Sequence, residues 1–426
     1  MNNKNNQYWF YIDSFIHISV KNKNILYYNP YTGKILEFQD NDTALRLTRR
    51  LLNPRNLRVI RLNPTDLKIP GISTFVQTIR DYYMGDLIDS LLSDSKPVQM
   101  PPKVKVQKDF NYLKNDLDRS PGENLMNYLD EITIHINDTC RQTCDNCSSF
   151  YRQMTFCTAK KSQNHFLNLE LLKIFFSDIK GCRLSNINIT GGNVLLYPEL
   201  GSLIALLDSV KSSKTIYLHY LNAAPHLKEL QLFGKGDYSF KMPVTIPFQE
   251  NKFEEIYKYS TKFKFDIVPL FPIQCDEEFN YVEDIRSRYP FGAYEYVPFY
   301  SGKNLSFFED NFFTTRQDIE TYKPSLRSIY ANYVINSFHF GKITVMADEA
   351  IHANVNGLKL GKLGKNSLYK CINNEIEKGK NWLKTRRNIL PCKSCTYQML
   401  CPPISNYNEV IGKNNLCKIW VVQEKK

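Results

Sequence analysis

The chain has 426 residues, of which 42% are hydrophobic and 13% aromatic, and its formal net charge is +12. This length exceeds a single hydrophobic core and predicts two or three domains, and the composition excludes disorder over most of the chain. No run of about 18 apolar residues occurs, and the first residues, MNNKNNQYWFYID, lack the apolar segment of a secretion signal. We therefore expect a cytoplasmic protein without a membrane-spanning helix.

The positive charge is spread along the chain rather than gathered in a tail. Its densest stretch is RRLLNPRNLRVIR, from Arg49 to Arg61. A dispersed charge is typical of a solvated surface, and an acidic peptide fits it better as a partner than nucleic acid does. We do not expect nucleic acid to be a partner.

Residues 1–92 begin with short runs of aromatic and β-branched residues, which are WFYIDSFIHISV, ILYYN and KILEF, separated by Asn, Gly and Pro. Two helical stretches follow, DNDTALRLTRRLLN and ISTFVQTIRDYYMGDLIDSLL. This order predicts an α+β domain in which a three-stranded antiparallel sheet precedes helices. Residues 93–128 are rich in Pro and Lys and are predicted to form a linker.

From residue 129 to 335, near-continuous apolar runs such as ITIHIN and SNINIT alternate with amphipathic helical stretches. This alternation predicts an α/β fold with a parallel sheet covered on both faces, in the form of a partial (β/α)6 TIM-like barrel. Two histidines, His135 and His219, lie on strand-like runs and are expected to be buried in the core or lumen. Active sites of such sheets lie at the carboxyl ends of the strands.

Three cysteines follow the first of these strands in the stretch CRQTCDNC, at Cys140, Cys144 and Cys147. In a reducing compartment we expect metal ligation rather than disulfides, and three thiolates leave a metal centre one ligand short. Two other interpretations are open at this point. A zinc site could be completed by Cys157 or His165, and the last two cysteines of the motif could form a redox pair.

Residues 336–426 form a third segment. It begins with a predicted hairpin, FGKITVMADEAIHANVNG, and ends in a second group of cysteines. These are Cys392, Cys395, Cys401 and Cys417. Four thiolates complete a tetrahedral shell, so the group predicts either an iron-sulfur cluster or a zinc site.

The turn after the second strand contains Gly191, Gly192 and Asn193. A CX3CX2C motif after the first strand and a Gly-Gly turn after the second resemble the radical S-adenosylmethionine (SAM) enzymes. The resemblance implies that the three cysteines of CRQTCDNC bind a [4Fe-4S] cluster whose fourth iron binds SAM and generates a 5′-deoxyadenosyl radical. It also implies that the two glycines let the backbone approach the methionine end of SAM.

The outer segments resemble the accessory domains of radical SAM peptide maturases. Residues 1–92 resemble a winged-helix-like domain that binds the leader of a precursor peptide as an added strand, although a DNA-binding winged helix has the same pattern. Residues 336–426 resemble the SPASM domain, and their four clustered cysteines match the ligands of one auxiliary [4Fe-4S] cluster. The cysteines of the other auxiliary cluster are absent, because Ser337, Asn354 and Ser405 occupy their positions.

Two positions of the predicted SAM site depart from the family pattern. Asn146 replaces the aromatic or apolar residue expected near adenine, and Asn193 replaces the acid that meets the SAM amino group. An amide in place of a carboxylate weakens that contact by about 1–2 kcal/mol. This pattern resembles the pseudo-radical-SAM proteins of Bacteroidales GG-type peptide systems. It implies either a radical SAM/SPASM enzyme acting on a precursor peptide, or a catalytically degenerate scaffold that binds the peptide or a second, genuine maturase.

Overall fold

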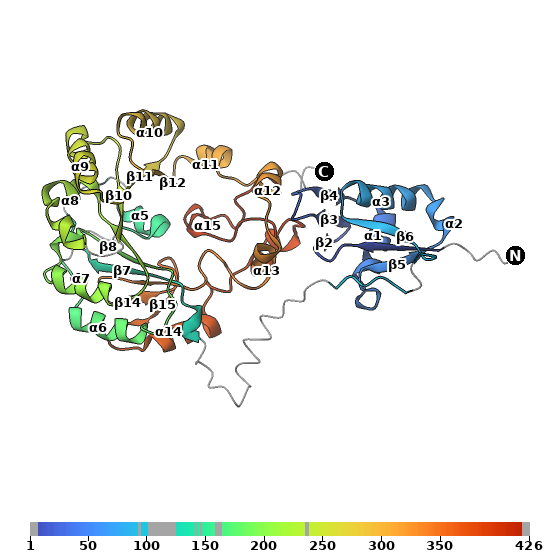
Figure 1. The fold of residues 1–426 in the computed structure, drawn as a ribbon, viewed down its shortest axis with the longest axis horizontal. Coiled ribbons are helices and arrows are strands. Elements are labelled where there is room, and N and C mark those ends of the chain that lie inside the picture. The colour runs from blue at the N-terminus through green and yellow to red at the C-terminus, as the bar shows by residue number, and fades with distance from the viewer. Residues whose placement is uncertain are drawn as a thin grey trace.

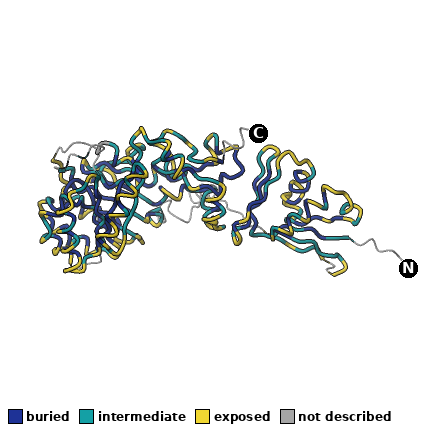
Figure 2. Tube along the Cα trace, turned by 90° about the horizontal axis from the view of Figure 1, so that it is seen from above, coloured by how far each residue is buried: buried dark blue, intermediate teal, exposed yellow. Residues whose placement is uncertain are grey.

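The structure is a computed structural model that describes residues 7–92, 95–100, 125–140, 142, 144, 147–157, 164–234 and 238–419. For Cys147 and Ser148 only the helical backbone is described, and Asn146 lies outside the described residues. The chain forms a small N-terminal domain, residues 7–92, and a larger body built around one sheet (Figure 1). Figure 2 shows buried segments within both parts, with the exposed residues mainly on their outer turns and helix faces.

The N-terminal domain contains two antiparallel three-stranded sheets within its described residues, where the sequence predicted one. One sheet has the order β5-β1-β6 and the other the order β2-β3-β4. The strands are β1 (Tyr8–Ile12), β2 (His17–Lys21), β3 (Asn24–Tyr28), β4 (Ile35–Phe38), β5 (Val59–Leu62) and β6 (Gly85–Asp89). The run WFYIDSFIHISV is therefore divided between two sheets.

The second sheet was missed because β6 lies in a stretch that the sequence predicted to be helical. Helix α3 (Pro70–Asp81) ends four residues before β6, and Tyr83 has a positive φ of 56°. Gly85 then pairs with Ile12, and a Cβ at Gly85 would lie 2.1 Å from the carbonyl oxygen of Tyr11. Only glycine permits this close approach, so the chain leaves the helix and enters the sheet there.

Two helices cover the core of the N-terminal domain. Helix α1 (Asp42–Leu52) begins at Asn41, whose side chain accepts a hydrogen bond from the amide of Ala44 at 2.9 Å. The apolar faces of α1 and α3 pack on residues of both sheets in one hydrophobic cluster. The short elements η1 (Pro54–Asn56) and α2 (Pro64–Leu67) connect them.

The body contains a nine-stranded sheet among the described residues, in the order β12-β11-β10-β9-β8-β7-β13-β14-β15. From β7 to β12 neighbouring strands are parallel and follow chain order, which confirms an α/β fold with a large parallel sheet. The order is linear, with β12 and β15 at its two edges. The strands are β7 (Glu131–Asn137), β8 (Asn186–Gly191), β9 (Ser213–Tyr217), β10 (Tyr238–Pro243), β11 (Ile267–Ile273), β12 (Glu295–Pro298), β13 (Lys342–Val345), β14 (Ala350–His352) and β15 (Lys359–Lys362).

The hairpin predicted at the start of the third segment is confirmed, but it does not stand apart from the body. Strand β13 pairs in parallel with β7, and β14 and β15 continue the same sheet in antiparallel order. The boundary placed at residue 336 therefore falls within one continuous sheet.

Helices lie on both sides of this sheet. Helices α6, α7, α9 and α10 share one core with the sheet and lie on its outer side, whereas α5 lies on the side that faces α15 (Figure 1). The helices are α5 (Cys147–Met154), α6 (Leu169–Asp178), α7 (Leu200–Asp208), α8 (Tyr220–Ala223), α9 (Glu250–Phe263), α10 (Asp276–Arg288), α11 (Leu305–Asn311), α12 (Arg316–Tyr322), α13 (Leu326–Val334), α14 (Leu368–Lys378) and α15 (Asn406–Ile411). In the part of the chain that is described, no helix has both the length and the apolar character needed to cross a bilayer.

The strands are less uniformly apolar than predicted, because their inner face carries hydrogen-bonded polar residues. On β7, Ile132 and Ile134 join the outer core, whereas Thr133 is turned to the opposite face. Asn188 donates to Thr133 Oγ1 at 3.2 Å and to Glu131 Oε1 at 2.8 Å. Buried polar groups are tolerated there because they bond one another.

The N-terminal domain packs against the cysteine-bearing end of the chain. Leu26 and Ile35 share a hydrophobic cluster with residues of α12, α13 and the 395–419 stretch. Arg316 bridges the two parts, since it pairs with Glu37 at 3.0 Å and donates to the carbonyl of Ile35 at 2.9 Å. The four clustered cysteines therefore lie close to the joint between the N-terminal domain and the body.

Candidate metal and cofactor sites

The cysteine loop, residues 138–147, leaves the carboxyl end of β7, as the sequence predicted. Cys140 and Cys144 are partly buried and free of disulfides, and Cys147 begins helix α5. The loop therefore lies at the edge of the sheet where α/β proteins place ligands. The side chain of Cys147 and all of Asn146 lie outside the described residues.

A buried amide that sequence analysis missed, Asn137, joins the cysteine loop to the glycine turn. Its Oδ1 accepts hydrogen bonds from the amides of Gly192 at 3.0 Å and Thr139 at 3.2 Å, and its Nδ2 donates to the carbonyl of Asn193 at 2.8 Å. The amide of Asn193 donates to the carbonyl of Thr139 at 2.6 Å. The two motifs thus form one hydrogen-bonded unit. In the sequence, the signal for Asn137 was its position as a polar residue at the end of an apolar strand.

The two glycines make room for the cysteine loop itself. A Cβ on Gly192 would lie 2.0 Å from the carbonyl oxygen of Thr139, and one on Gly191 would lie 2.4 Å from that of Asn137. Gly191 also has a φ of +140°. This contact gives the glycines a structural reason that is independent of SAM.

Asn193 is buried and caps the short helix η3 (Val194–Leu196). Its Oδ1 accepts a hydrogen bond from the amide of Leu195 at 3.1 Å. The side-chain oxygen at position 193, where the sequence resemblance expects an acid, is therefore already engaged in a local cap.

Two side chains from the turn after β9 reach the sulfurs of the cysteine loop. Asn222 is buried, its Nδ2 lies 4.0 Å from Cys140 Sγ, and its Oδ1 accepts from Gln142 at 2.8 Å. His219 Nε2 lies 4.0 Å from Cys144 Sγ. Both N–S distances are at the long end for hydrogen bonds to sulfur.

The orientation of His219 defines what it can do. Its Nδ1 accepts a hydrogen bond from the amide of Leu221 at 3.2 Å. Burial lowers the pKa of His219 to about 4, so the ring is neutral at pH 7 and its proton lies on Nε2. The Nε2 of His219 therefore lies within reach of both Cys144 Sγ, at 4.0 Å, and Thr245 Oγ1, at 3.5 Å. His135, the other predicted interior histidine, is fully buried on β7.

His165 and Cys157, which the sequence analysis considered as a fourth zinc ligand, contact groups other than the cysteine loop's thiols. His165 is half exposed and lies 2.9 Å from the carboxylate of Asp138. Cys157 packs against an apolar cluster that includes Phe156 and Leu270. Within the described residues, no group of three or more Cys, His, Asp or Glu side chains lies at metal-binding spacing.

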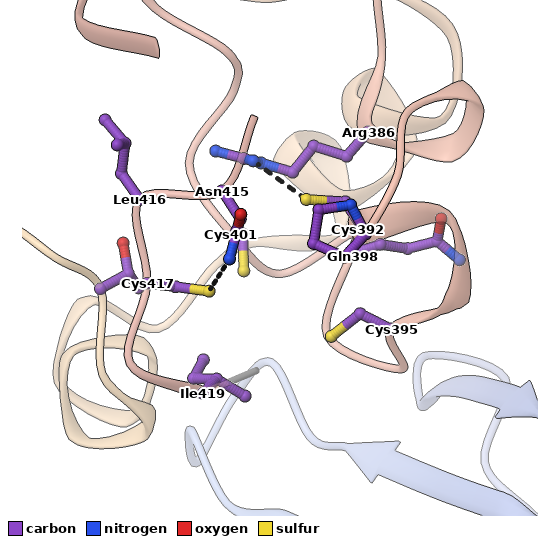
Figure 3. Close-up of a pocket in the computed structure, with 11 residues that line it drawn as sticks. Arg386, Cys392, Cys395, Gln398, Cys401, Asn415, Leu416, Cys417 and Ile419 are labelled. Atoms are coloured by element: carbon purple, nitrogen blue, oxygen red, sulfur yellow. Dashed lines mark hydrogen bonds between the residues drawn. The ribbon is translucent and has the colours of Figure 1, made fainter. Parts of the chain in front are cut away.

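The second cysteine group lines one pocket near the N-terminal domain (Figure 3). The space measures about 380 Å³, part of it open to solvent. Its four thiols are those of Cys392, Cys395, Cys401 and Cys417. The structure thus brings together four side chains separated by up to 25 positions in sequence, and it records each of them as free of disulfides.

Burial makes two of these thiols, those of Cys395 and Cys401, poor acids. It raises the pKa of Cys395 to about 12 and raises that of Cys401 further, and the neighbouring thiolates add to both shifts. A metal ion reverses this effect, because a coordinating thiol is deprotonated outright. Four thiol side chains on one pocket are the type of donor that zinc and iron-sulfur clusters take, but in this conformation the described side chains do not stand at metal-binding spacing.

The positions expected for the other auxiliary cluster are used for local structure. Asn354 is buried, and its Nδ2 lies 3.3 Å from His339 Nε2. Ser405 is the N-cap of α15. Asn354 thus supports a turn, and Ser405 a helix end.

Comparison with known proteins gave matches only among solved structures: no family model matches the chain, and no curated protein matches it. Three similar crystal structures are of SuiB from Streptococcus suis, described as bound to precursor peptide SuiA, bound to S-adenosylmethionine, and without a stated ligand. In that order, the TM-scores are 0.43, 0.40 and 0.41 and the identities 11%, 11% and 10%. The matches cover 95%, 95% and 96% of this chain and 97%, 97% and 100% of SuiB. Likenesses at this level assign this chain neither a family nor a function.

Proposed function

We propose that the chain is an iron-sulfur protein of the radical SAM/SPASM type that acts in the maturation of a ribosomally synthesised peptide. One observation carries the proposal: the CX3CX2C loop and the Gly191-Gly192 turn meet at the carboxyl edge of β7 and β8, where Asn137 bonds both. On this proposal Cys140, Cys144 and Cys147 hold a [4Fe-4S] cluster. When bound, the cluster and SAM supply the 5′-deoxyadenosyl radical.

The chain's own residues would orient the reactants and exclude water. Asn137 fixes the start of the cysteine loop, and His219 and Asn222 direct N–H groups toward its sulfurs. On the inner face of the sheet, Phe156 stacks on Tyr217 with ring centroids 5.4 Å apart. This aromatic contact shields the floor of the site from solvent.

The other two segments have separate roles in the proposal. The four-cysteine pocket holds the auxiliary cluster, and the N-terminal domain binds the leader of the precursor peptide as an added strand. In the sheet β2-β3-β4 the edge strands are β2 and β4, and Arg316 already donates to Ile35 on β4. We therefore assign the peptide to the edge of β2, a strand that pairs with β3 alone among the described strands.

A second candidate function is a catalytically degenerate scaffold, as in the pseudo-radical-SAM proteins. Two observations favour it. The side-chain oxygen of Asn193 caps η3 instead of presenting a carboxylate, and α5 fills the inner face of the sheet. Phe150 of α5 lies 4.4 Å from Phe299, measured between ring centroids. A scaffold would bind the precursor peptide, a genuine radical SAM maturase, or both.

Anaerobic purification and cluster reconstitution test the proposal and separate the two candidates. A working enzyme is expected to contain about eight irons per chain, from two four-iron clusters, and to release 5′-deoxyadenosine from SAM after reduction. Iron without 5′-deoxyadenosine, in an assay where a known radical SAM enzyme is active, indicates the scaffold. Zinc in place of iron at both sites overturns the cluster proposal.

A further inference from the structure

A buried arginine lies against the four-cysteine pocket. Arg386, on the short helix η6 (Arg386–Asn388), is 9% exposed, and its Nη1 donates to Cys392 Sγ at 3.4 Å (Figure 3). Neither the sequence motif nor the spacing of the cysteines points to this residue. A charged group buried to this extent requires a partner of opposite charge or a full set of hydrogen bonds.

The guanidinium of Arg386 connects the segments that carry three of the four cysteines. Besides the sulfur of Cys392, its Nε donates to the carbonyl of Pro402 at 2.7 Å, and its Nη1 donates to the carbonyl of Asn414 at 3.0 Å. Pro402 follows Cys401 directly, and Asn414 lies three residues before Cys417. One planar group therefore fixes the relative positions of three ligand segments, which a lysine ammonium on a flexible stem does poorly.

Arg386 also supplies the charge that a metal centre in this pocket would need. Four thiolates around a dication leave an excess of negative charge, and burying that excess is unfavourable without a nearby cation. Among the described residues that line the pocket, Arg386 is the only one with a cationic side chain.

We propose that Arg386 is the positioning and charge-compensating residue of the four-cysteine centre, an inference that rests on the proposed occupation of this pocket by a metal or cluster. Replacing it removes both the tether between ligand segments and the buried positive charge. Two effects follow: faster loss of the metal, and a lower reduction potential if the centre is an iron-sulfur cluster, because the cation stabilises the more negative, reduced state.

The experiment uses the full chain with Cys140, Cys144 and Cys147 replaced by alanine, so that the four-cysteine centre alone is measured. In this background we would compare Arg386→Met, Arg386→Lys and a matched control, Arg387→Met. Arg387 is the next residue on η6, and it is exposed and bonded to the carbonyl of Tyr333 at 3.0 Å rather than to the pocket. Circular dichroism checks folding, chelator competition measures metal loss, and potentiometric titration measures the reduction potential.

The expected result is that Arg386→Met loses metal at least about tenfold faster than the parent, the range typical of residues that orient metal ligands, and Arg387→Met does not. Arg386→Lys should restore most of the potential, because it keeps the charge, but not the retention, because it loses the planar fork. Parent-like retention in Arg386→Met overturns the proposal. If Arg386→Met does not fold, Arg386→Lys decides: parent-like retention in that variant overturns it.

Failure of this inference can be told apart from failure of the proposed function. Zinc in the four-cysteine pocket, with retention dependent on Arg386, removes the auxiliary cluster and supports the arginine's role. Iron-sulfur clusters with 5′-deoxyadenosine formation, but retention and potential independent of Arg386, support the function and overturn the inference.

Discussion

At the carboxyl edge of β7, Cys140 and Cys144 lie on a loop that a buried amide, Asn137, ties to the sheet, whereas the four cysteines of the C-terminal segment line a shared pocket. In the proposed function, the first site holds its cluster with three thiols and leaves a position for a small ligand. The second carries four thiols on one pocket, the number of ligands that a closed metal site requires. Both sites use cysteine side chains, but the first is proposed to stay open to a ligand and the second to be closed by protein ligands.

The surroundings differ in the same way. Cys395 and Cys401 belong to a hydrophobic cluster with Leu26 and Ile35 of the N-terminal domain, so the second site is part of the framework. The cysteine loop follows the end of a strand: Cys144 packs at the margin of a small apolar cluster that includes Phe150, and the polar side chain of Asn222 lies against Cys140. We therefore expect a metal at the second site to stabilise the fold, and a metal at the first site to bind a ligand.

The largest expected effect comes from a ligand of the second site. Cys401→Ser should remove that metal and lower the free energy of unfolding by several kcal/mol, because the bound metal contributes directly to folding. Cys144→Ser should remove the first metal with little loss of stability. Metal analysis and thermal unfolding measure both, with Cys182→Ser as the control at a cysteine outside either site. Equal destabilisation by the two substitutions would break the comparison.

A smaller effect is expected where the first site depends on close backbone packing. Gly192→Ala should destabilise the protein by about 3 kcal/mol and weaken metal binding at the first site only, because the new Cβ would meet the carbonyl of Thr139 at 2.0 Å. Gly201→Ala, on α7, has no neighbour within 4 Å and is the matched control. Chemical denaturation and metal analysis provide the measurements. Parent-like stability of Gly192→Ala would show that the loop is not packed on the turn.

Acid should lower the free energy of unfolding through His135, on strand β7. Burial lowers the pKa of His135 to about 4, below its usual value near 6.5. Between these values the unfolded chain binds a proton that the folded chain excludes, so this stabilisation is complete above pH 6.5 and falls as the pH drops toward 4. His135→Asn should reduce the loss between pH 7 and 5 by about 2 kcal/mol. Denaturation at several pH values tests this, and a pH dependence in His135→Asn equal to that of the parent would contradict it.

A carboxylate at position 193, where the sequence resemblance expects one, tests whether the first site binds SAM. Asn193→Glu should tighten SAM binding about tenfold, or 1–2 kcal/mol, if the open position of the first site receives SAM. Isothermal titration measures the affinity, and the same substitution in a Cys140→Ser background should show no SAM binding. Unchanged affinity in Asn193→Glu would favour the scaffold.

The smallest effect is expected at the joint that encloses the second site. Arg316→Gln should cost about 0.5–1 kcal/mol, because the Arg316–Glu37 pair is partly exposed. It should raise hydrogen exchange in β4, whose Ile35 carbonyl accepts from Arg316, without changing β5. Arg80→Gln, which removes a pair with Asp86 inside the N-terminal domain, is the control for a surface ion pair. Unchanged exchange in β4 would show that apolar packing alone holds the joint.

Several features were predictable because they depend on local pattern. Alternating apolar and amphipathic runs predicted the parallel sheet, and CRQTCDNC was placed correctly at the end of β7. The hairpin in the third segment was also predictable from its turn residues. Polar positions on the inner face of the strands were read as part of apolar runs, since the hydrogen bonds among Glu131, Thr133 and Asn188 join different strands.

The sequence by itself determined which side chains carry chemistry and in what order, because cysteine spacing, glycine pairs and strand periodicity are properties of neighbouring residues. Only the tertiary structure decided what surrounds them. It placed His219 and Asn222 beside cysteines 75 and 82 positions away, and it directed Arg386 at the four-cysteine pocket. It also divided the first β-run between two sheets and joined β13 to β7. Such contacts arise from burial and hydrogen bonding between distant segments, which no local pattern encodes.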